Sequence, residues 1–286
     1  MKVTIIITTK NRPLQLDYAL KSVFLQSITA DQIIVIDDGS DIENVKLRND
    51  VRIDYYYKQC SSGPAKARNF GIKQAQGDII FFLDDDDAWH VDHLKTHISA
   101  HINCEIALCA SRKRILQARS DKVLRITKFD FNKNIFINNF IGGPSSVSVK
   151  KSALINVGSF NESLKALEDY ELWIKIVKYY SSSAVYLIDD FTIDYYVSNI
   201  HHQNVSANVK NHFLAKDIIL NENRDLSTAN YKSLEAYLDF CIAKTIHRKS
   251  YINFLNFIVS KHSFNFKMTK LLIPALLLRM FGLVST

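Results

Sequence analysis

Residues 79–87 read Ile-Ile-Phe-Phe-Leu-Asp-Asp-Asp-Asp, an apolar run that stops abruptly in four carboxylates. The apolar part is typical of a strand buried on both faces of a parallel sheet. Ligands of open α/β sheets bind at the carboxyl ends of such strands, where these aspartates lie. Adjacent carboxylates raise each other's pKa unless a cation compensates, and hard cations such as Mg²⁺ prefer oxygen ligands. The run therefore predicts a cation site, with a solvated acidic turn as the alternative.

Strand and helix signals alternate through the first hundred residues. Continuous β-branched runs predict buried strands at Val3–Thr9, Ile33–Ile36 and Val51–Tyr57, in addition to the strand before the aspartates. Helical spacing of apolar residues predicts a helix after the first strand and another over Ala65–Gln76, with Gly77 as the C-terminal stop of the latter. This order predicts an α/β fold with a doubly wound, mostly parallel sheet.

The pattern changes further along the chain. The signals predict strands at 106–110, 123–129, 146–149, 185–188 and 193–197, a loop at 142–145 and a helix over 168–180. From about Ala207 the signals are helical and the composition shifts. We therefore expect two domains, residues 1–206 and residues 207–286.

The composition is that of an ordinary folded protein. Of the 286 residues, 47% are hydrophobic and 23% charged, which is ample material for a core. The four cysteines contain no CxxC pair and are interpreted as reduced thiols. The N-terminus lacks the features of a signal peptide, and no apolar run reaches 18 residues. These features predict a cytoplasmic protein without a transmembrane helix.

The net charge of +7 arises largely from the C-terminal region. No nucleic-acid-binding motif accompanies the basic residues, so we expect no nucleic-acid partner. The apolar segment Leu271–Phe281 has Lys261, Lys267, Lys270 and Arg279 in or near it. This pattern suits peripheral association with the inner face of the cytoplasmic membrane. Packing onto the first domain, or an oligomer contact, is the alternative.

A second acidic cluster, Asp37-Asp38-Gly39-Ser40, ends the second predicted strand. Carboxylates at such positions accept hydrogen bonds from a ribose hydroxyl in other nucleotide-binding α/β folds. A simple Asp-Gly turn is the alternative. Because two strands end in acidic clusters at the same expected edge, we favour a ligand site.

Five segments, in this order, resemble family 2 glycosyltransferases of the GT-A fold. They are the opening strand Val3–Arg12, the nucleotide-binding turn Val35–Ser40, the Ala-Arg-Asn-x-Gly helix within Gly63–Ile72, the Asp-x-Asp segment Phe82–Asp87, and the Glu-Asp motif with its Leu-Trp continuation, Glu168–Trp173. The resemblance covers roughly the first 200 residues. It implies a Rossmann-like GT-A nucleotide-diphospho-sugar transferase fold, followed here by a helical C-terminal extension.

The resemblance also implies a site for a nucleotide-sugar donor. Thr8 or Thr9 and Asp37 would hold the nucleoside, with Asp38 as a neighbour. Arg68 would contact the diphosphate or brace the acidic loop.

The run of four aspartates would hold Mn²⁺ or Mg²⁺ by this resemblance. Asp86 is the first choice of metal ligand, with Asp84 as the other member of the pair and Asp87 behind it, while Asp85 belongs to the donor site. A cation there bridges the diphosphate and neutralises charge as the leaving group departs.

Asp169 is the candidate general base of an inverting transfer, with Glu168 as the second choice. A neighbouring negative charge raises the pKa of a base towards neutrality. Favourable interaction with the dipole at the start of a helix is the alternative explanation for this acidic pair. By the same resemblance, Gly142–Ser145 borders the acceptor pocket, unless it is only a tight turn.

Two groups of histidines are further candidates. His201 and His202 lie where relatives close the nucleotide site, and either would reach the metal or the phosphates unless this is a surface loop. His93, His97 and His101 recur every four residues, which can place imidazoles on one helix face to bind a transition metal. No cysteine or carboxylate completes that pattern, so an amphipathic helix is the better interpretation.

The expected activity is metal-dependent, inverting transfer of a hexosyl or N-acetylhexosaminyl group. The donor is expected to be a UDP-sugar, and the acceptor a hydroxyl of a glycan or lipid-linked glycan, in bacterial surface polysaccharide synthesis such as lipopolysaccharide or capsule. One alternative is a nucleotidyltransferase, although Thr8–Pro13 lacks the glycine-rich phosphate loop typical of that class. The other is a non-catalytic relative that binds nucleotide or glycan.

Overall fold

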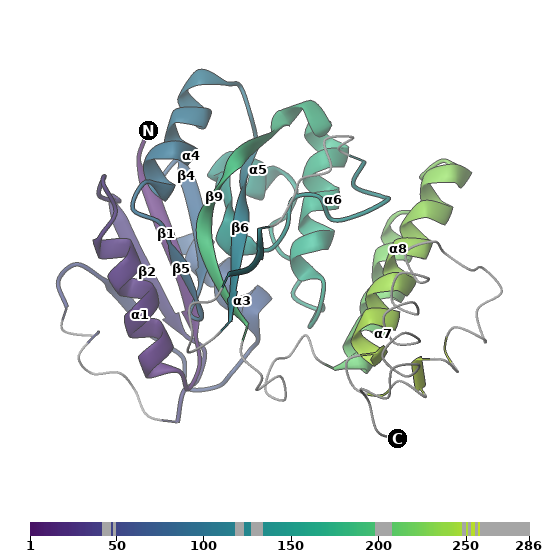
Figure 1. Cartoon of the computed structure of the whole chain (residues 1–286), viewed down its shortest axis with the longest axis horizontal. Helices are drawn as coiled ribbons and strands as arrows, with labels where there is room; N and C mark the ends of the chain where they lie inside the picture. The colour runs from purple at the N-terminus through teal and green to yellow at the C-terminus, as the bar shows by residue number, and fades with distance from the viewer. Residues whose placement is uncertain are drawn as a thin grey trace. The chain divides into compact units, whose positions relative to one another are not determined.

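The computed structural model describes residues 1–41, 47, 50–117, 123–126, 134–197, 208–247, 250, 253–254 and 257 (Figure 1). These residues belong to two compact units. The described residues of Met1–Ile135, Asn139–Ser163 and Glu168–Ile200 form the first unit; those of Phe136–Asn138, Leu164–Leu167 and His201–Thr286 form the second. The division at residues 206 and 207 stays a prediction.

A single mixed sheet forms the centre of the first unit. Its strands are β1 (Val3–Thr9), β2 (Gln32–Asp37), β3 (Asp54–Tyr57), β4 (Ile79–Asp84), β5 (Asp87–Trp89), β6 (Leu108–Gln117), β7 (Val123–Ile126), β8 (Val147–Lys150) and β9 (Val185–Val197). The order is β3-β2-β1-β4-β8-β6-β9-β5, with β7 paired to β6. The first four strands in this order are mutually parallel, as are β6 and β9, whereas β8 and β5 run antiparallel to their neighbours. The predicted α/β fold with a mostly parallel sheet is confirmed.

Helices cover this sheet and form the second unit. The first unit contains α1 (Pro13–Phe24), α3 (Pro64–Gln74), α4 (His93–Asn103), α5 (Lys151–Asn156), α6 (Glu168–Tyr180) and the 3₁₀ turns η1 (Pro144–Ser146) and η2 (Ser182–Ala184). The second contains α7 (Val209–Glu222) and α8 (Thr228–His247). Both α1 and α3 begin at a proline, which lacks the amide hydrogen that a helix leaves unbonded in its first turn.

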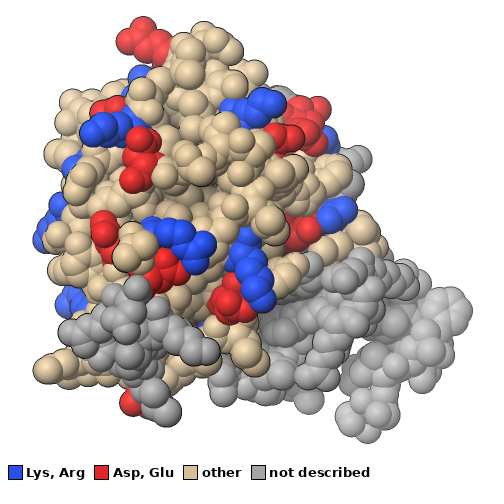
Figure 2. Space-filling view, turned by 90° about the vertical axis from the view of Figure 1, so that its left-hand side faces the viewer, with Lys and Arg blue, Asp and Glu red and all other residues tan. Residues whose placement is uncertain are grey.

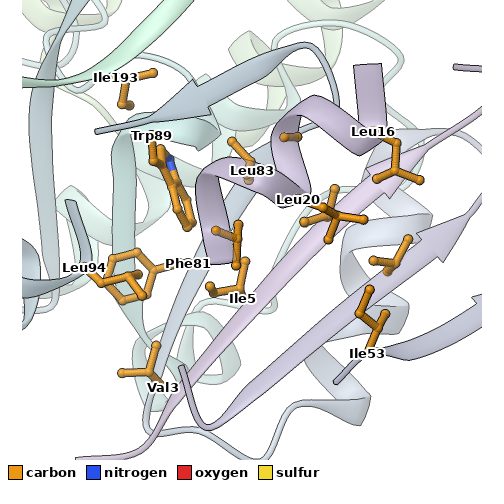
Figure 3. Packing of buried hydrophobic residues seen from close by; sticks show 14 of the residues in the cluster. Val3, Ile5, Leu16, Leu20, Ile53, Phe81, Leu83, Trp89, Leu94 and Ile193 are labelled. Carbon is orange, nitrogen blue, oxygen red and sulfur yellow. The ribbon is translucent and has the colours of Figure 1, made fainter. Parts of the chain in front are cut away.

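One core cluster of the described residues joins the parallel strands to α1 and α4 (Figure 3). Ile5 of β1 and Phe81 of β4 are fully buried, and Leu20 of α1 packs in the same cluster. Each such side chain stabilises the fold by about 1.5–3 kcal/mol relative to an exposed one. The core thereby fixes the positions at which β1 and β4 end.

Several element boundaries differ from those that the sequence predicts. Strands predicted separately at 185–188 and 193–197 form the continuous β9, which shifts register against β6 near Arg112. The third strand begins at Asp54 rather than Val51. The strand expected to reach Phe129 is described only to Ile126. No sequence pattern predicted β5, because its short run Asp-Ala-Trp continues directly from the acidic residues.

The expectation that Gly77 stops α3 was wrong. The helix ends at Gln74, and Ala75 takes an extended conformation there. Gly77 instead lies against β1, where a Cβ atom would stand 2.5 Å from the backbone nitrogen of Thr4. The glycine is required for close approach of two segments rather than for capping.

The helices of the second unit contain a buried ion pair. Lys216 of α7 donates to Asp239 of α8 at 2.8 Å, and its ammonium lies 3.4 Å from Glu235. No helix in the part of the chain that the structure describes has the length and apolar character needed to cross a membrane. The segment 271–281, which prompted the membrane hypothesis, lies outside the described residues.

The histidines of α4 lie in the core. His93, His97 and His101 are all at most 3% exposed, and their rings bond to hydroxyls of Thr192 and Ser148. Among the described residues, no group of three or more His, Cys, Asp or Glu side chains is placed to hold a metal ion. The structure thus supports the interpretation of this row as the inner face of an amphipathic helix.

The burial of His97 should make the stability of the protein depend on pH. Burial, and secondarily the nearby His101, lowers the pKa of His97 to about 3, whereas an unfolded histidine titrates near 6.5. Unfolding therefore takes up a proton below pH 6.5, and stability is lost as the pH falls from there. Relative to wild type, His97→Gln should gain about 1.4 kcal/mol in unfolding free energy for each pH unit below 6.5. Urea unfolding at pH 7.5, 6 and 5 measures this difference.

The carboxylates contribute equally to the pH dependence of stability in wild type and in His97→Gln. The difference between the two proteins therefore reports the titration of His97. Ser99→Ala, at an exposed position of the same helix, is the control and should give a difference independent of pH. Parallel pH profiles for wild type and His97→Gln would contradict the expectation.

Candidate active site

Three parallel strands end side by side at the edge where the predicted site residues lie. In the sheet register, Thr8 of β1 is opposite Asp84 of β4, and Thr9 is opposite Asp37 of β2. The two acidic strand ends therefore flank the end of β1. This edge is where ligands of parallel α/β sheets bind.

The four consecutive aspartates differ in their exposure. The side chains of Asp84 and Asp86 are 34% and 42% exposed, whereas that of Asp85 is 6% exposed. Asp87 begins β5 and is buried. Alternate residues of the run therefore present carboxylate oxygens to solvent, and the accessible pair is Asp84 and Asp86.

Asp85 is held by neighbouring residues of the opening segment. The hydroxyl of Thr9 donates to Asp85 at 2.8 Å, and the guanidinium of Arg12 donates to it at 3.0 Å. Arg12 also bonds Asp86 at 3.1 Å. Burial raises the pKa of Asp85 to about 6, although Arg12 and Thr9 act in the opposite direction. Thr9 and Asp85 thus brace the acidic segment.

Repulsion between like charges remains within the segment. Partial burial and the charge of Asp84 both raise the pKa of Asp86, while Arg12 opposes them. Burial raises the pKa of Asp87 to about 8, against the attraction of Lys113. Additional positive charge at the accessible pair would relieve this repulsion.

The oxygens of Asp84 and Asp86 fit a hard divalent cation. Magnesium-type ions are commonly bound by one or two carboxylates together with substrate phosphates. A two-carboxylate site of this kind leaves coordination positions for a ligand. The buried carboxylate of Asp87 is a poorer candidate than the two exposed ones.

Arg68 joins the acidic strand end to the start of α6. Its side chain is 7% exposed and donates to Asp84 at 2.7 Å and to Glu168 at 3.0 Å. Burial by itself would lower the pKa of Arg68, but the two carboxylates raise it further above its ordinary value. Of the two roles expected for Arg68, these contacts favour bracing over a diphosphate contact.

The residues around Arg68 have structural roles in α3. The side-chain amide of Asn69 donates to the backbone carbonyl of Phe160, accepts from the backbone N–H of the same residue, and also donates to Glu162 at 3.0 Å. At Gly71, a Cβ atom would stand 2.7 Å from Ile6 of β1. In the Ala-Arg-Asn-x-Gly pattern, Arg68 therefore belongs to the site, whereas Asn69 and Gly71 hold α3 against neighbouring segments.

Asp37 and Asp38 are both buried and hydrogen-bonded within the chain. Asp37 accepts from the backbone of Ser40 at 2.9 Å and from the hydroxyl of Tyr55 at 2.9 Å. Asp38 accepts from Ser61, Ser62 and Gly63, and these bonds lower its pKa although burial opposes them. Asp38 organises the loop before α3. Asp37 ends β2 opposite Thr9, and half-buried Thr8 is the residue before Thr9 on β1.

The acidic pair Glu168-Asp169 begins α6. Burial and the adjacent charge of Glu168 raise the pKa of Asp169 to about 7, and the positive charges of Arg68 and Lys113 limit the rise. The carboxylate accepts from the backbone of Tyr170 at 2.7 Å. A carboxylate that titrates near neutral pH is suited to take up a proton during a reaction.

Two tryptophans hold the loop between β7 and β8. Trp89 of β5 donates its indole hydrogen to the carbonyl of Ser145, and Trp173 of α6 donates to the carbonyl of Gly142, both at 2.8 Å. The hydroxyl of Ser145 accepts from the backbone of Asp84 at 3.0 Å. The loop is thus connected to both the acidic strand end and the helix that carries Asp169.

The structure adds two basic residues that sequence reasoning did not assign. Arg12 follows the end of β1, and its place in the opening motif was a usable signal. Lys113 of β6 lies near Gly143, since its ammonium is 3.1 Å from the point where a Cβ of Gly143 would stand. No motif surrounds Lys113 in the sequence. His201 and His202 lie outside the described residues.

Acidic and basic side chains lie beside one another on the face shown in Figure 2. The ion pairs Arg12–Asp86 and Arg68–Asp84 show the same mixing within the site. Arginines therefore compensate part of the negative charge of the site, and the repulsion among its remaining carboxylates persists.

Removing the Arg68 guanidinium should destabilise the protein strongly. Arg68→Met would leave Asp84 and Glu168 without their buried partner, and we expect a loss of about 3–5 kcal/mol in unfolding free energy. Urea unfolding measures the loss. Arg52→Met is the matched control, because Arg52 pairs with Asp50 on the surface and its removal should change stability far less. Equal losses in the two variants would contradict a bracing role for Arg68.

Solved structures resemble the fold at low sequence identity. Staphylococcus aureus TarS 1–349 in complex with UDP-GlcNAc matches with a TM-score of 0.65 and 20% identity, over 92% of this chain and 76% of that one. Mannosyltransferase PcManGT from Pyrobaculum calidifontis, in complex with GDP-Man and Mn²⁺, matches with a TM-score of 0.63 and 17% identity, over 98% and 80% of the two chains. These similarities support the GT-A fold.

Sequence comparison finds relatives among bacterial glycosyltransferases. An uncharacterized glycosyltransferase of Rickettsia conorii is 30% identical over 61% of this chain, but the match spans only 30% of that relative's length. The GalNAc(5)-diNAcBac-PP-undecaprenol beta-1,3-glucosyltransferase of Campylobacter jejuni is 31% identical over 62% of this chain and 60% of its own. The Escherichia coli enzyme WfgD, a UDP-Glc:alpha-D-GlcNAc-diphosphoundecaprenol beta-1,3-glucosyltransferase, is 30% identical over 64% and 72%.

The family comparison covers the two acidic strand ends and ends before α6, the helix that carries Glu168 and Asp169. The profile of "Glycosyl transferase family 2" matches residues 4–164, which include both acidic strand ends and the Ala-Arg-Asn-x-Gly helix. The chain belongs to glycosyl transferase family 2.

Proposed function

We propose that this protein is an inverting glycosyltransferase that moves a sugar from a nucleotide donor to a hydroxyl of a glycan or lipid-linked glycan. One observation carries the proposal. Asp84, which together with Asp86 presents its carboxylate to solvent, is joined through Arg68 to Glu168. Glu168 adjoins Asp169, whose pKa burial raises to about 7. These contacts support the assignment of a diphosphate-bound cation to Asp84 and Asp86 and of the acceptor hydroxyl's proton to Asp169.

On the donor side, Asp84 and Asp86 would hold Mn²⁺ or Mg²⁺. The cation would supply charge stabilisation for the diphosphate leaving group. Thr8 and Asp37, at the ends of β1 and β2, are the proposed nucleoside contacts. Thr9, Asp38 and Arg68 act by holding the segments that carry these groups.

On the acceptor side, Asp169 takes the proton from the attacking hydroxyl. The hydroxyl oxygen bonds to the anomeric carbon as the bond to the diphosphate oxygen breaks, and the proton passes to the Asp169 carboxylate. A direct displacement of this kind inverts the anomeric configuration. Glu168 is occupied with Arg68 and acts through its negative charge on Asp169.

The names of the relatives suggest the substrate classes. The Escherichia coli and Campylobacter jejuni relatives are named as glucosyltransferases acting on sugars linked to undecaprenol diphosphate. We therefore propose a UDP-sugar donor and a lipid-linked glycan acceptor for this chain. Residues 1–206 would form the catalytic domain, and residues 207–286 an extension at the inner face of the cytoplasmic membrane, in a pathway of surface polysaccharide synthesis.

Replacing the base should abolish most sugar transfer. Asp169→Asn removes the proton acceptor, and we expect turnover to fall by about 10²–10⁴-fold. In the wild type, turnover should rise with pH through about 7, because the ionised carboxylate is the active form. Transfer is measured with UDP-glucose or UDP-N-acetylglucosamine and N-acetylglucosamine-diphosphate-polyprenol. Asp17→Asn, at an exposed aspartate of α1, is the control. Turnover at the wild-type rate in a folded Asp169→Asn variant would contradict the role of Asp169 as the base.

Sugar transfer should depend on a divalent metal ion, and this dependence should change when Asp84 or Asp86 is replaced. We expect EDTA to remove transfer activity and Mn²⁺ to restore it. Asp84→Asn or Asp86→Asn should raise the Mn²⁺ concentration for half-maximal activity by at least about 10-fold, since each removes one charged oxygen ligand. Asp17→Asn again serves as the control. Unchanged Mn²⁺ dependence in both site variants would place the cation elsewhere, and transfer at full rate without metal would exclude the proposed metal role.

A binding experiment separates the alternatives. Calorimetry with UDP and Mn²⁺ detects a nucleotide site, and a product assay then distinguishes an enzyme from a non-catalytic binder. Formation of a nucleotide sugar from sugar phosphate and UTP would instead indicate a nucleotidyltransferase. The anomeric configuration of the glycoside product, read by NMR, tests inversion.

A further inference from the structure

Lys113 is a basic residue of the site to which the family motifs assign no role. It lies on β6, in register with Ile193 of β9, and is half-buried. Its ammonium nitrogen and Oδ2 of Asp169 lie 3.1 Å and 3.9 Å from one point, the position that a Cβ of Gly143 would occupy. The lysine and the carboxylate therefore approach the same small space from different elements.

The position of the Lys113 ammonium, and not the backbone conformation, accounts for a glycine at position 143. Its φ of −86° and ψ of 168° are extended values that any residue adopts. A side chain there would stand 3.1 Å from the Lys113 ammonium, which is closer than ordinary van der Waals contact. The glycine at position 143 therefore leaves a point close to both the ammonium and the carboxylate without a side-chain atom.

The charges that face Asp169 come from three elements. Glu168 on its own helix disfavours the ionised carboxylate, as does burial, whereas Arg68 of α3 and Lys113 of β6 favour it. Arg68 is already bonded to Asp84 and Glu168. Lys113 comes from the sheet, and its ammonium and Oδ2 of Asp169 both lie within 4 Å of the point where a Cβ of Gly143 would stand.

We propose that Lys113 is a positioning residue, which keeps Asp169 ionised and its Oδ2 directed into the space above Gly143, where the acceptor hydroxyl enters. This inference rests on the proposed function for the identity of the acceptor group. The electrostatic coupling between Lys113 and Asp169 does not depend on that function. The two statements can therefore be tested separately.

The first test is the pH dependence of transfer in Lys113→Met, Lys113→Arg and Gly143→Ala. The substrates are UDP-glucose or UDP-N-acetylglucosamine with N-acetylglucosamine-diphosphate-polyprenol. Loss of the ammonium should move the acidic limb of the kcat profile up by about one pH unit. Lys113→Arg should stay close to wild type because it keeps the charge, and Gly143→Ala should shift in the same direction as Lys113→Met. Lys73→Met, at an exposed lysine of α3, controls for net charge and should leave the profile unchanged.

The second test is a double-mutant cycle that needs no substrate. At pH 8.5, where Asp169 is ionised, Lys113→Met should lower the urea midpoint more in the wild-type background than in Asp169→Asn. The cycle removes the separate effect of Lys113 on Asp87.

The outcomes distinguish the two statements. Equal losses of the urea midpoint in both backgrounds, or a Lys113→Met profile that coincides with wild type, would overturn the role of Lys113. If wild type transfers no sugar while the cycle shows coupling, the proposed function fails and the electrostatic link stands. A smaller loss in the Asp169→Asn background together with the shifted acidic limb supports the inference.

Discussion

The buried guanidinium of Arg68 is the contact on which the geometry of the site depends. A charge with 7% exposure is tolerated because two carboxylates, from Asp84 and Glu168, compensate it. One of them ends a central strand and the other begins α6. A single side chain therefore fixes the distance between the acidic strand end and the helix that carries Asp169.

Local sequence signals were sufficient to predict the parallel strands at the centre of the scaffold. The apolar run before Asp84 and the β-branched run of β1 could be recognised as buried strands without tertiary information. The convergence of Asp37 and Asp84 followed from the rule that parallel strands end at one edge. The sequence did not predict which of the four aspartates are exposed, because their exposure depends on the contacts of Asp85 with Arg12 and Thr9.

Tertiary proximity accounts for what sequence reasoning missed. Lys113 lies on a long strand and carries no motif, so only the folded arrangement shows that it faces Gly143. Glycine often ends helices, but at position 77 a glycine is required because the chain approaches Thr4 closely there. Strand β5 is three residues long and forms because β9 provides its hydrogen-bonding partner.

The loop at Gly142–Ser145 has a spectroscopic consequence. The chain contains two tryptophans, Trp89 and Trp173, and each donates its indole hydrogen to a carbonyl of this loop. The tryptophan fluorescence of the protein therefore comes from two side chains that are both bonded to one short segment. Any ligand that displaces these carbonyls changes the surroundings of every tryptophan in the chain, so the protein carries a built-in optical reporter of its own site.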